Sequence, residues 1–314
     1  MTPCLEFSEM DTVEFTLGET CDGPTGRRDV QPMRVEFGAM SHRGRVRPNN
    51  EDHYLVWRSP AAPAPLLTNL PDGFLPLNND VSYGIAVADG IGGAAFGEVA
   101  SMLAVRTAWE LGLGQVEPRT TSEHDAAGEG MERLESSFRS IHDKLLQRGA
   151  SDASLLGMGT TLTAAYTAGR ELFIGHVGDS RAYLVRQGAI RCLTRDHTLR
   201  RELIDAGIVR ANSEEARAVR NVLTSRLGGI DADLRVDTVR VPILDGDCLV
   251  LCTDGLTDLL SDTEISQILR MHADSKAASA ELVDLALRRG ARDNVTVVVA
   301  RFTIPPASPT SRCD

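Results

Sequence analysis

A short apolar run that ends on an acid and a cluster of glycines constrains this chain more than any other stretch. Residues 85–88, Ile-Ala-Val-Ala, have the length and composition of a buried strand, and Asp89 and Gly90 follow directly. Gly92 and Gly93 let the backbone turn tightly and approach a bound group. An acid at such a strand end suits a hard cation, although an ordinary glycine-rich turn gives the same pattern.

The composition narrows the class of protein. With 42% hydrophobic and 25% charged residues, the 314-residue chain is typical of a globular protein. A net charge of -11 argues against binding nucleic acid. No apolar run reaches the roughly 18 residues of a membrane span, and no export signal is visible, so we expect a cytoplasmic protein without a membrane partner. The six cysteines contain no CxxC pair, and we expect reduced thiols.

The pattern along the chain predicts one folded domain with two tails. Residues 1–33 form an acidic extension that we expect to be disordered, residues 34–303 the domain, and residues 304–314 a short tail. Strand-like runs come in groups with helices between them, which favours antiparallel sheets covered by helices. The expected helices span 98–112, 131–147, 262–271 and 276–289; the strands after residue 150 span 160–167, 172–177, 182–186, 190–193, 222–227, 234–241, 248–252 and 295–302.

Four acidic groups stand at the ends of apolar strands. They are Glu51-Asp52 before the run 54–57, Asp89 after 85–88, Asp254 after 249–253, and Asp293 before 295–300. Each alone is an ordinary turn signal. Together they predict that one edge of the fold gathers carboxylates, which remain ionised only if cations offset their repulsion.

Oxygen ligands without a histidine or cysteine pair beside them favour Mg²⁺ or Mn²⁺ over zinc or copper. Two such ions, bridged by one carboxylate, would lower the pKa of a shared water and supply a nucleophile for attack on phosphorus. Arg47, five residues before Asp52, is the candidate that would hold the phosphate oxygens. The alternative is a solvated arginine in a basic loop with Arg43 and Arg45.

Six motifs in chain order resemble those of the PPM-type metal-dependent protein phosphatases, the protein phosphatase 2C-like enzymes. They are Gly44 to Asp52, Asp89 to Gly93, Gly159 to Thr161, Gly178 to Arg181, Thr253 to Leu256 and Asp293 to Thr296. The resemblance covers residues 34–303. It implies an α+β fold, a four-layer αββα sandwich of two antiparallel β-sheets flanked by helices, with a metal pair in a cleft at one edge.

The resemblance also implies roles for individual residues. Its metal ligands are Glu51, Asp52, Asp89, Gly90, Asp179, Asp254 and Asp293. Asp89 would bridge two manganese or magnesium ions, and Gly90 would lend its carbonyl oxygen. Asp254 and Asp293 would bind directly.

The remaining implied roles are less direct. Glu51 and Asp52 would act directly or through water. Asp179 matches the acid that helps hold a third, weaker metal in bacterial relatives. Arg47 and Asp89 are the residues we expect to be catalytic.

Three features of the sequence leave alternatives open. Ile91 occupies the position where many eukaryotic relatives have a histidine, so the general acid is unassigned: a metal-bound water is one candidate, and His42 is an unsupported alternative. The run 178–180, Gly-Asp-Ser, also resembles the nucleophile turn of a serine esterase, but Ala182 stands where that motif has glycine. Residues 198–221 resemble the flap that borders the cleft in bacterial relatives, although a solvated helix has the same pattern.

The function we expect is hydrolysis of phosphoserine and phosphothreonine by in-line attack of a metal-bridged water. The partners would be phosphoproteins that a serine/threonine kinase has modified. One alternative is a phosphatase acting on a partner-switching regulator, which differs in substrate only. The other is a non-catalytic binding module with the same fold.

Overall fold

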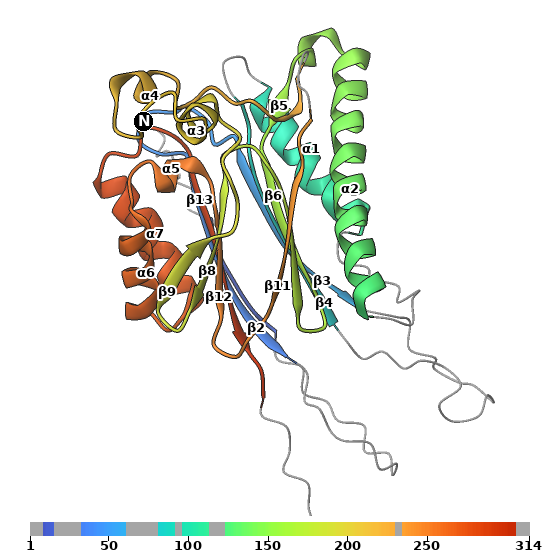
Figure 1. Ribbon diagram of the computed structural model, residues 1–314, viewed down its shortest axis with the longest axis vertical. Helices are drawn as coiled ribbons and strands as arrows, with labels where there is room; N and C mark the ends of the chain where they lie inside the picture. The colour runs from blue at the N-terminus through green and yellow to red at the C-terminus, as the bar shows by residue number, and fades with distance from the viewer. Residues whose placement is uncertain are drawn as a thin grey trace, which may run out of the picture.

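The computed structural model describes residues 9–15, 33–60, 81–91, 96–112, 123–229 and 234–305. Within these ranges, two antiparallel sheets pack face to face and helices cover both outer surfaces (Figure 1). This arrangement is the predicted four-layer αββα sandwich. It follows from strands that are apolar on both faces, since each sheet must bury one face on its partner and the other under helices.

The first sheet has six strands and contains the C-terminal strand of the domain. Its order is β1 (Glu9–Phe15), β2 (Arg34–His42), β13 (Val295–Thr303), β12 (Cys248–Cys252), β8 (Arg181–Arg186) and β9 (Ala189–Cys192). β1 falls in the N-terminal extension of residues 1–33, and its backbone pairs with β2, which would otherwise be an edge of the sheet. The rest of residues 1–32 lie outside the described ranges.

The second sheet has five strands. Its order is β11 (Asp237–Pro242), β7 (Glu171–Val177), β6 (Leu162–Ala168), β4 (Val81–Asp89) and β3 (Asp52–Pro60), and a separate pair joins β10 (Leu227–Gly228) to β5 (Gly159–Thr160). The strands expected at 160–167 and 172–177 pair as the antiparallel hairpin β6–β7, and those expected at 182–186 and 190–193 pair as the hairpin β8–β9. The chain crosses from one sheet to the other between β7 and β8. The expected strand at 222–227 is wrong up to residue 226, because only Leu227 enters β10.

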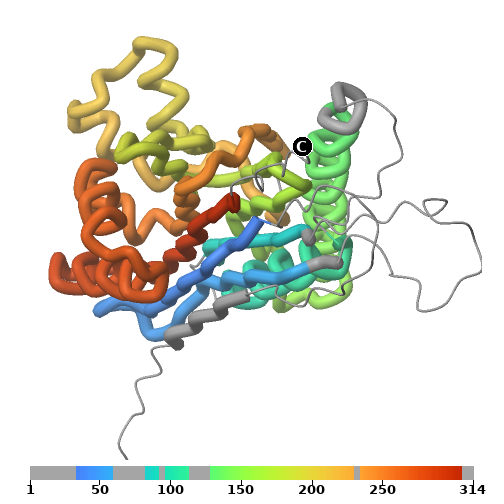
Figure 2. Tube along the Cα trace, turned by 90° about the horizontal axis from the view of Figure 1, so that it is seen from below, coloured from blue at the N-terminus to red at the C-terminus, as the bar shows by residue number. Residues whose placement is uncertain are grey.

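Helices α1 (Gly97–Glu110) and α2 (Glu123–Ser151) pack on the five-stranded sheet, and α6 (Asp262–Met271) and α7 (Ser275–Arg288) on the six-stranded sheet. Figure 2 shows α2 and the α6–α7 pair on opposite sides of the strands. Short helices α3 (Leu199–Asp205), α4 (Glu214–Ala218) and α5 (Asp254–Thr257) lie together at one end of the sandwich (Figure 1), and a 3-10 turn, Ala153–Leu155, follows α2.

Helix α2 begins eight residues before the predicted start at 131. Its first turns contain Gly128 and Gly130, and glycine is a poor helix former, so the sequence pattern there does not predict a helix. Gly130 lies against Phe173, where an added Cβ would be 2.8 Å from a ring carbon, and its carbonyl accepts a hydrogen bond from the Tyr166 hydroxyl at 3.1 Å. Packing on the sheet therefore overrides the poor helix propensity of glycine here.

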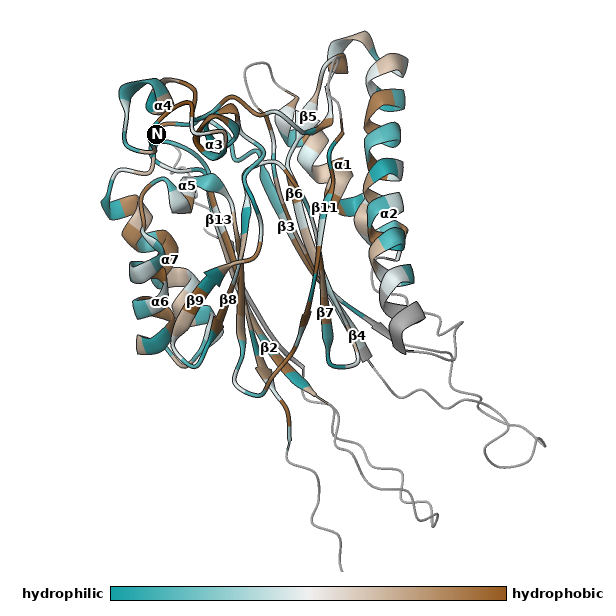
Figure 3. Cartoon of the chain, viewed as in Figure 1, coloured by the Kyte–Doolittle hydropathy of each residue, from teal (hydrophilic) through white to brown (hydrophobic). Residues whose placement is uncertain are grey.

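The apolar core has three parts, matching the three interfaces between four layers. The middle part lies between the sheets and includes Phe37, Ile85, Val87, Ile174, Leu249 and Val298. Two outer parts lie under the helices. Figure 3 shows hydrophobic residues along the strands and hydrophilic ones on α2. Two buried layers on each sheet make the strands rigid supports for the residues at their ends.

The structure bears on two expectations from the sequence, namely reduced cysteines and the lack of a membrane span. Cys192, Cys248 and Cys252 are free, while the other three cysteines lie outside these ranges. Among the helices that the structure describes, none combines the length and apolar character needed to cross a bilayer. The cytoplasmic location remains a prediction.

Candidate metal centre

Asp52 and Asp89 lie side by side at one end of the five-stranded sheet. β3 begins at Asp52, β4 ends at Asp89, and the two residues are direct partners in the antiparallel ladder. Directly opposed residues place their side chains on the same face of a sheet. The backbone is fixed on both sides, because Gly90 N donates to Glu51 O at 3.1 Å and Thr161 N donates to Asp89 O at 2.9 Å. Two acids are thus held together by strand pairing alone.

Asp52 is almost completely buried, with 4% of its surface exposed. Its Oδ2 accepts hydrogen bonds from the hydroxyls of Thr253 at 2.9 Å and Thr296 at 2.7 Å. Its Oδ1 is buried without a hydrogen-bond partner. An unsatisfied carboxylate oxygen in the interior is costly, which makes it a position where a cation would be stabilising.

Asp254 and Asp293 come from the other sheet. Asp254 opens α5 two residues after the end of β12, and Asp293 lies two residues before the start of β13. Asn294 ties this end to the loop before β3: its amide donates to Asn49 O at 2.8 Å and its side-chain oxygen accepts from Glu51 N at 2.8 Å. The same end of both sheets therefore carries these acids.

Arg47 lies at the outer rim of this group. Its guanidinium contacts Asp293 Oδ2 at 2.8 Å, with 43% of the arginine and 41% of the aspartate side chain exposed. The hydrogen bond with Asp293 raises the pKa of Arg47. The residue is therefore a permanent cation beside the acids, and its half-exposed position lets it exchange partners.

Asp179 lies where the chain crosses between the sheets. Gly178 before it has φ 112°, a conformation that favours glycine, and a Cβ there would be 2.5 Å from the Thr161 side chain. Burial and then the charge of Asp254 raise the pKa of Asp179 well above its usual value. The Ser180 hydroxyl, 3.0 Å from the Thr161 hydroxyl, is completely buried, which counts against the serine-esterase alternative.

The pKa values show that these acids act on one another. Burial, followed by the charges of Asp52 and Asp254, raises the pKa of Asp89 well above its usual value. Burial raises the pKa of Asp52 to about 7 against its two threonine hydrogen bonds. Burial, together with Asp258 and Asp293, raises the pKa of Asp254 to about 7. A buried cluster of like charges is unfavourable unless positive charge offsets it.

The side chains of these acids do not converge on one common point. Within the described ranges, no three acidic, histidine or cysteine side chains are arranged so that they could hold a metal ion as they stand. Two observations still fit a divalent cation: the unpartnered Oδ1 of Asp52, and a donor set made only of oxygens. Gly90 fits as well, since a Cβ would lie 2.3 Å from Gly97 O. Gly92 and Gly93 lie outside the described ranges.

Sequence reasoning missed the residues that support the acids. The Thr253 and Thr296 hydroxyls hold Asp52, and Asn294 joins two loops. All three stand inside quoted motifs, directly beside or near an aspartate. Their neighbourhood in the chain was therefore a signal, but their hydrogen bonds depend on how β12 and β13 pair.

Comparisons with known proteins agree with this architecture. Residues 76–288 match the family described as protein phosphatase 2C. The chain is 33% identical to the serine/threonine phosphatase stp of Listeria monocytogenes over 274 residues, covering 85% of this chain and 95% of that protein. It is 34% identical over 268 residues to the serine/threonine protein phosphatase PstP of Mycobacterium tuberculosis, covering 85% of this chain and 45% of that protein.

Solved structures show the same fold. The crystal structure of the Mycobacterium tuberculosis phosphatase PstP/Ppp has a TM-score of 0.68 at 32% identity, covering 86% of this chain and 99% of that one. A PstP catalytic domain in complex with two manganese ions has a TM-score of 0.66 at 32% identity, with the same coverage of both chains.

The architecture is that of a phosphatase sandwich with acids at one end. The chain therefore belongs to the protein phosphatase 2C family of metal-dependent serine/threonine phosphatases. The resemblance drawn from the sequence motifs is confirmed.

Proposed function

We propose that this chain hydrolyses phosphoserine and phosphothreonine in proteins. The observation that carries the proposal is the meeting of acids from both sheets at one end of the sandwich, with Asp52 and Asp89 paired across β3 and β4. Arg47 beside Asp293 adds the cation that a phosphate needs. Relatives with 33% and 34% identity are named serine/threonine phosphatases, which supports the same substrate class here.

Two divalent ions would occupy this end, with Asp89 between them. The proposed ligands are Glu51, Asp52, Asp89, the Gly90 carbonyl, Asp254 and Asp293, with Asp179 and Asp254 at a third, weaker site. The manganese ions named for the PstP catalytic domain support Mn²⁺, and Mg²⁺ prefers the same oxygen donors. When bound, such ions supply a nucleophilic water at neutral pH and offset charge on the phosphate oxygens.

The chain's own residues position the substrate. Arg47 leaves Asp293 and holds two phosphate oxygens with its planar guanidinium. Thr253 and Thr296 hold one oxygen of Asp52 and so fix the orientation of that carboxylate. His42 Nδ1 accepts a hydrogen bond from Gly44 N at 2.9 Å, so this nitrogen carries no proton for a leaving group. The general acid is therefore not assigned to His42 Nδ1.

The substrates would be cytoplasmic phosphoproteins, and a serine/threonine kinase would be the opposing enzyme. Residues 34–303 would form the catalytic domain, with β1 added to its edge. A regulator of a partner-switching system would be one such substrate and needs no different chemistry.

The test is Mn²⁺-dependent release of phosphate from a phosphothreonine peptide. Wild-type protein should turn the peptide over and lose this activity on chelation. Asp89→Asn and Asp254→Asn should each lose it on the order of 10²-fold or more, since even residues outside a metal's direct ligands change activity 10- to 100-fold. Activity retained in either variant would refute the mechanism. A wild type inactive on both this peptide and an aryl phosphate would favour the binding module.

A further inference from the structure

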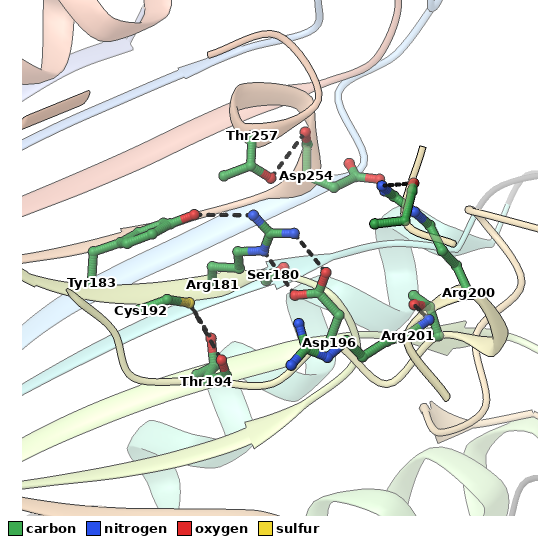
Figure 4. Close-up of polar contacts among 12 residues, drawn as sticks. Ser180, Arg181, Tyr183, Cys192, Thr194, Asp196, Arg200, Arg201, Asp254 and Thr257 are labelled. Carbon is green, nitrogen blue, oxygen red and sulfur yellow. Dashed lines mark hydrogen bonds and ion pairs between the residues drawn. The ribbon is translucent and has the colours of Figure 1, made fainter. Parts of the chain in front are cut away.

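A cavity of about 190 Å³ lies beside the acids of the metal centre. Asp179 and Asp254 line one side, and the segment containing α3 and α4 contributes Arg200, Arg201 and Arg220. Figure 4 shows this region, with Arg200 reaching from the α3 segment toward Asp254. We call it the flap cavity. Whatever projects from a phosphate-bearing residue held at the acids would be next to this space.

Two of the arginines that line the flap cavity are neutralised by aspartates. Arg181 makes a two-pronged ion pair with Asp196, at 2.8 and 2.6 Å (Figure 4). Arg201 pairs with Asp205 at 3.1 Å, one turn further along α3. Their charges are therefore used within the protein, and they are poor receptors for an incoming anion.

The other two arginines differ from each other. Arg220 lies 3.9 Å from the Asp258 carboxylate and donates to Asn221 at 3.1 Å. Within the described part of the chain, the Arg200 side chain makes one hydrogen bond, from Nη2 to Ala211 O at 3.4 Å, and its Nε is buried without a partner. No carboxylate among the described residues forms an ion pair with Arg200. Among the four arginines that line the cavity, Arg200 is thus the one that has no carboxylate partner within the described residues and a buried, unpartnered Nε.

A guanidinium with unused donors at the wall of a cavity favours an anion there whose oxygens accept two parallel hydrogen bonds, such as a carboxylate or a phosphate. The aspartates nearest to it, Asp179 and Asp254, are proposed metal ligands, so bound cations would offset their charge. Arg47, which contacts Asp293 and does not belong to the lining of the flap cavity, is the residue assigned to the phosphate itself. An anion at Arg200 would therefore be a different group of the same substrate.

We infer that Arg200 determines substrate specificity by binding an anionic group next to the phosphorylated residue. The group is an aspartate or glutamate carboxylate, or a second phosphate. The inference rests on the proposed function, because it places the phosphorylated residue at the acids. Arg200 binds the flanking group and takes no part in the hydrolysis.

The test uses full-length protein with Mn²⁺ and phosphothreonine peptides that differ only in the neighbouring residues. These are glutamate, lysine or a second phosphothreonine, placed on either side. For each protein the measured quantity is the ratio of kcat/KM for the glutamate or doubly phosphorylated peptide to that for the lysine peptide. Because each ratio is internal to one preparation, partial misfolding does not change it. The variants are Arg200→Met, Arg200→Glu and the control Arg217→Met, which removes an exposed charge from α4 outside the cavity.

Wild type should prefer an anionic neighbour about tenfold, the size expected of one charge-assisted hydrogen bond. Arg200→Met should bring the ratio near one, Arg200→Glu should invert it, and Arg217→Met should keep the wild-type ratio. A preference restricted to the glutamate or to the second phosphate identifies which anion Arg200 binds. An unchanged ratio in Arg200→Met, or an equal fall in Arg217→Met, would overturn the inference. Absence of turnover by wild type on any peptide would instead refute the proposed function.

Discussion

Asp52 and Asp247 are both buried aspartates, with 4% and 1% of their surface exposed. They lie near opposite ends of strand β12. Asp247 directly precedes β12 and receives two bonds from Arg186, at 2.8 and 2.7 Å, and one from Leu244 N at 2.8 Å. Asp52 contacts Thr253, which directly follows β12, and no cationic side chain in the described ranges forms an ion pair with it. Both carboxylates are therefore buried, but only that of Asp247 has a positive side chain to compensate its charge.

The difference separates a structural carboxylate from a functional one. At Asp247 the protein supplies its own counter-charge, so the group is complete without a ligand. At Asp52 one oxygen is unpartnered, and burial, with a smaller contribution from the charges of Asp254 and Asp293, raises the pKa of the carboxyl. Local instability of this kind is typical of sites prepared for a ligand. Making the same substitution at both residues tests whether they differ in this way.

The largest effect should come from replacing each aspartate with asparagine. Asp52→Asn should lower Mn²⁺-dependent turnover on the order of 10²-fold and make the chelated protein more stable, because a buried uncompensated charge is removed. Asp247→Asn should do the reverse. It should lower the free energy of unfolding by about 3 kcal/mol, since Arg186 loses its partner, and leave the turnover of folded protein unchanged. Urea unfolding and phosphate release on the same preparations decide the matter; equal stability losses would remove the distinction.

Arg47→Met should have the next largest effect. It removes the proposed phosphate contact, and a charge-assisted pair of hydrogen bonds is worth about 2–3 kcal/mol, so kcat/KM should fall roughly 10²-fold. Stability should change little, because the ion pair with Asp293 is half exposed. Arg43→Met is the matched control in the same loop. Equal losses in both variants would mean that the loop charge matters and the position of Arg47 does not.

Stability of the chelated protein should depend on pH in an unusual direction. Asp52 and Asp254 have folded pKa values of about 7, above the ordinary aspartate value, so the folded protein holds more protons than the unfolded chain between about pH 4 and 7. The stabilisation is present at the acid end of this window and is lost as pH rises through 7. Urea midpoints of chelated wild type should therefore fall between pH 5.5 and 8, and less so in Asp52→Asn. A rising midpoint with the same slope in both proteins would contradict the raised pKa values.

The smallest effect should come from Thr296→Val. It removes the hydrogen bond of 2.7 Å to Asp52 while keeping the shape of the side chain. Supporting residues of this kind change metal affinity 10- to 100-fold, and because Thr253 remains we expect about tenfold weaker Mn²⁺ binding. Titration calorimetry measures it, and Thr303→Val at the other end of β13 is the control. Unaltered affinity would show that Asp52 needs no such support.

The sequence identified the strands and acids, because apolar runs and the aspartates after them are local features. It did not show that Asp52 faces Asp89, since one predicted run began at 54, the other ended at 88, and ladder register is set by non-local pairing. The hydroxyls of Thr253 and Thr296 escaped for the same reason. They reach Asp52 only because β12 and β13 run side by side.

The strand expected at 222–227, of which only Leu227 lies in a strand, shows how a local pattern can mislead. Val222 and Leu223 favour a strand locally, but the backbone there bonds to the start of α3 and the residues just before it. Leu199 N donates to Val222 O at 2.8 Å, and Thr224 N donates to His197 O at 2.9 Å. Tertiary contacts override local propensity. The early start of α2 has a similar cause, since Gly130 packs against Phe173 of the sheet.

The central claim is that the acids at one end of the two sheets bind divalent cations together. Equilibrium titration of Mn²⁺ into chelated wild type and Asp89→Asn, with Asp247→Asn as control, tests it most directly. The account predicts two ions per chain in wild type and in Asp247→Asn, and loss of this binding in Asp89→Asn. Wild type that binds no Mn²⁺, or an Asp89→Asn variant that binds two ions with unchanged affinity, would contradict it.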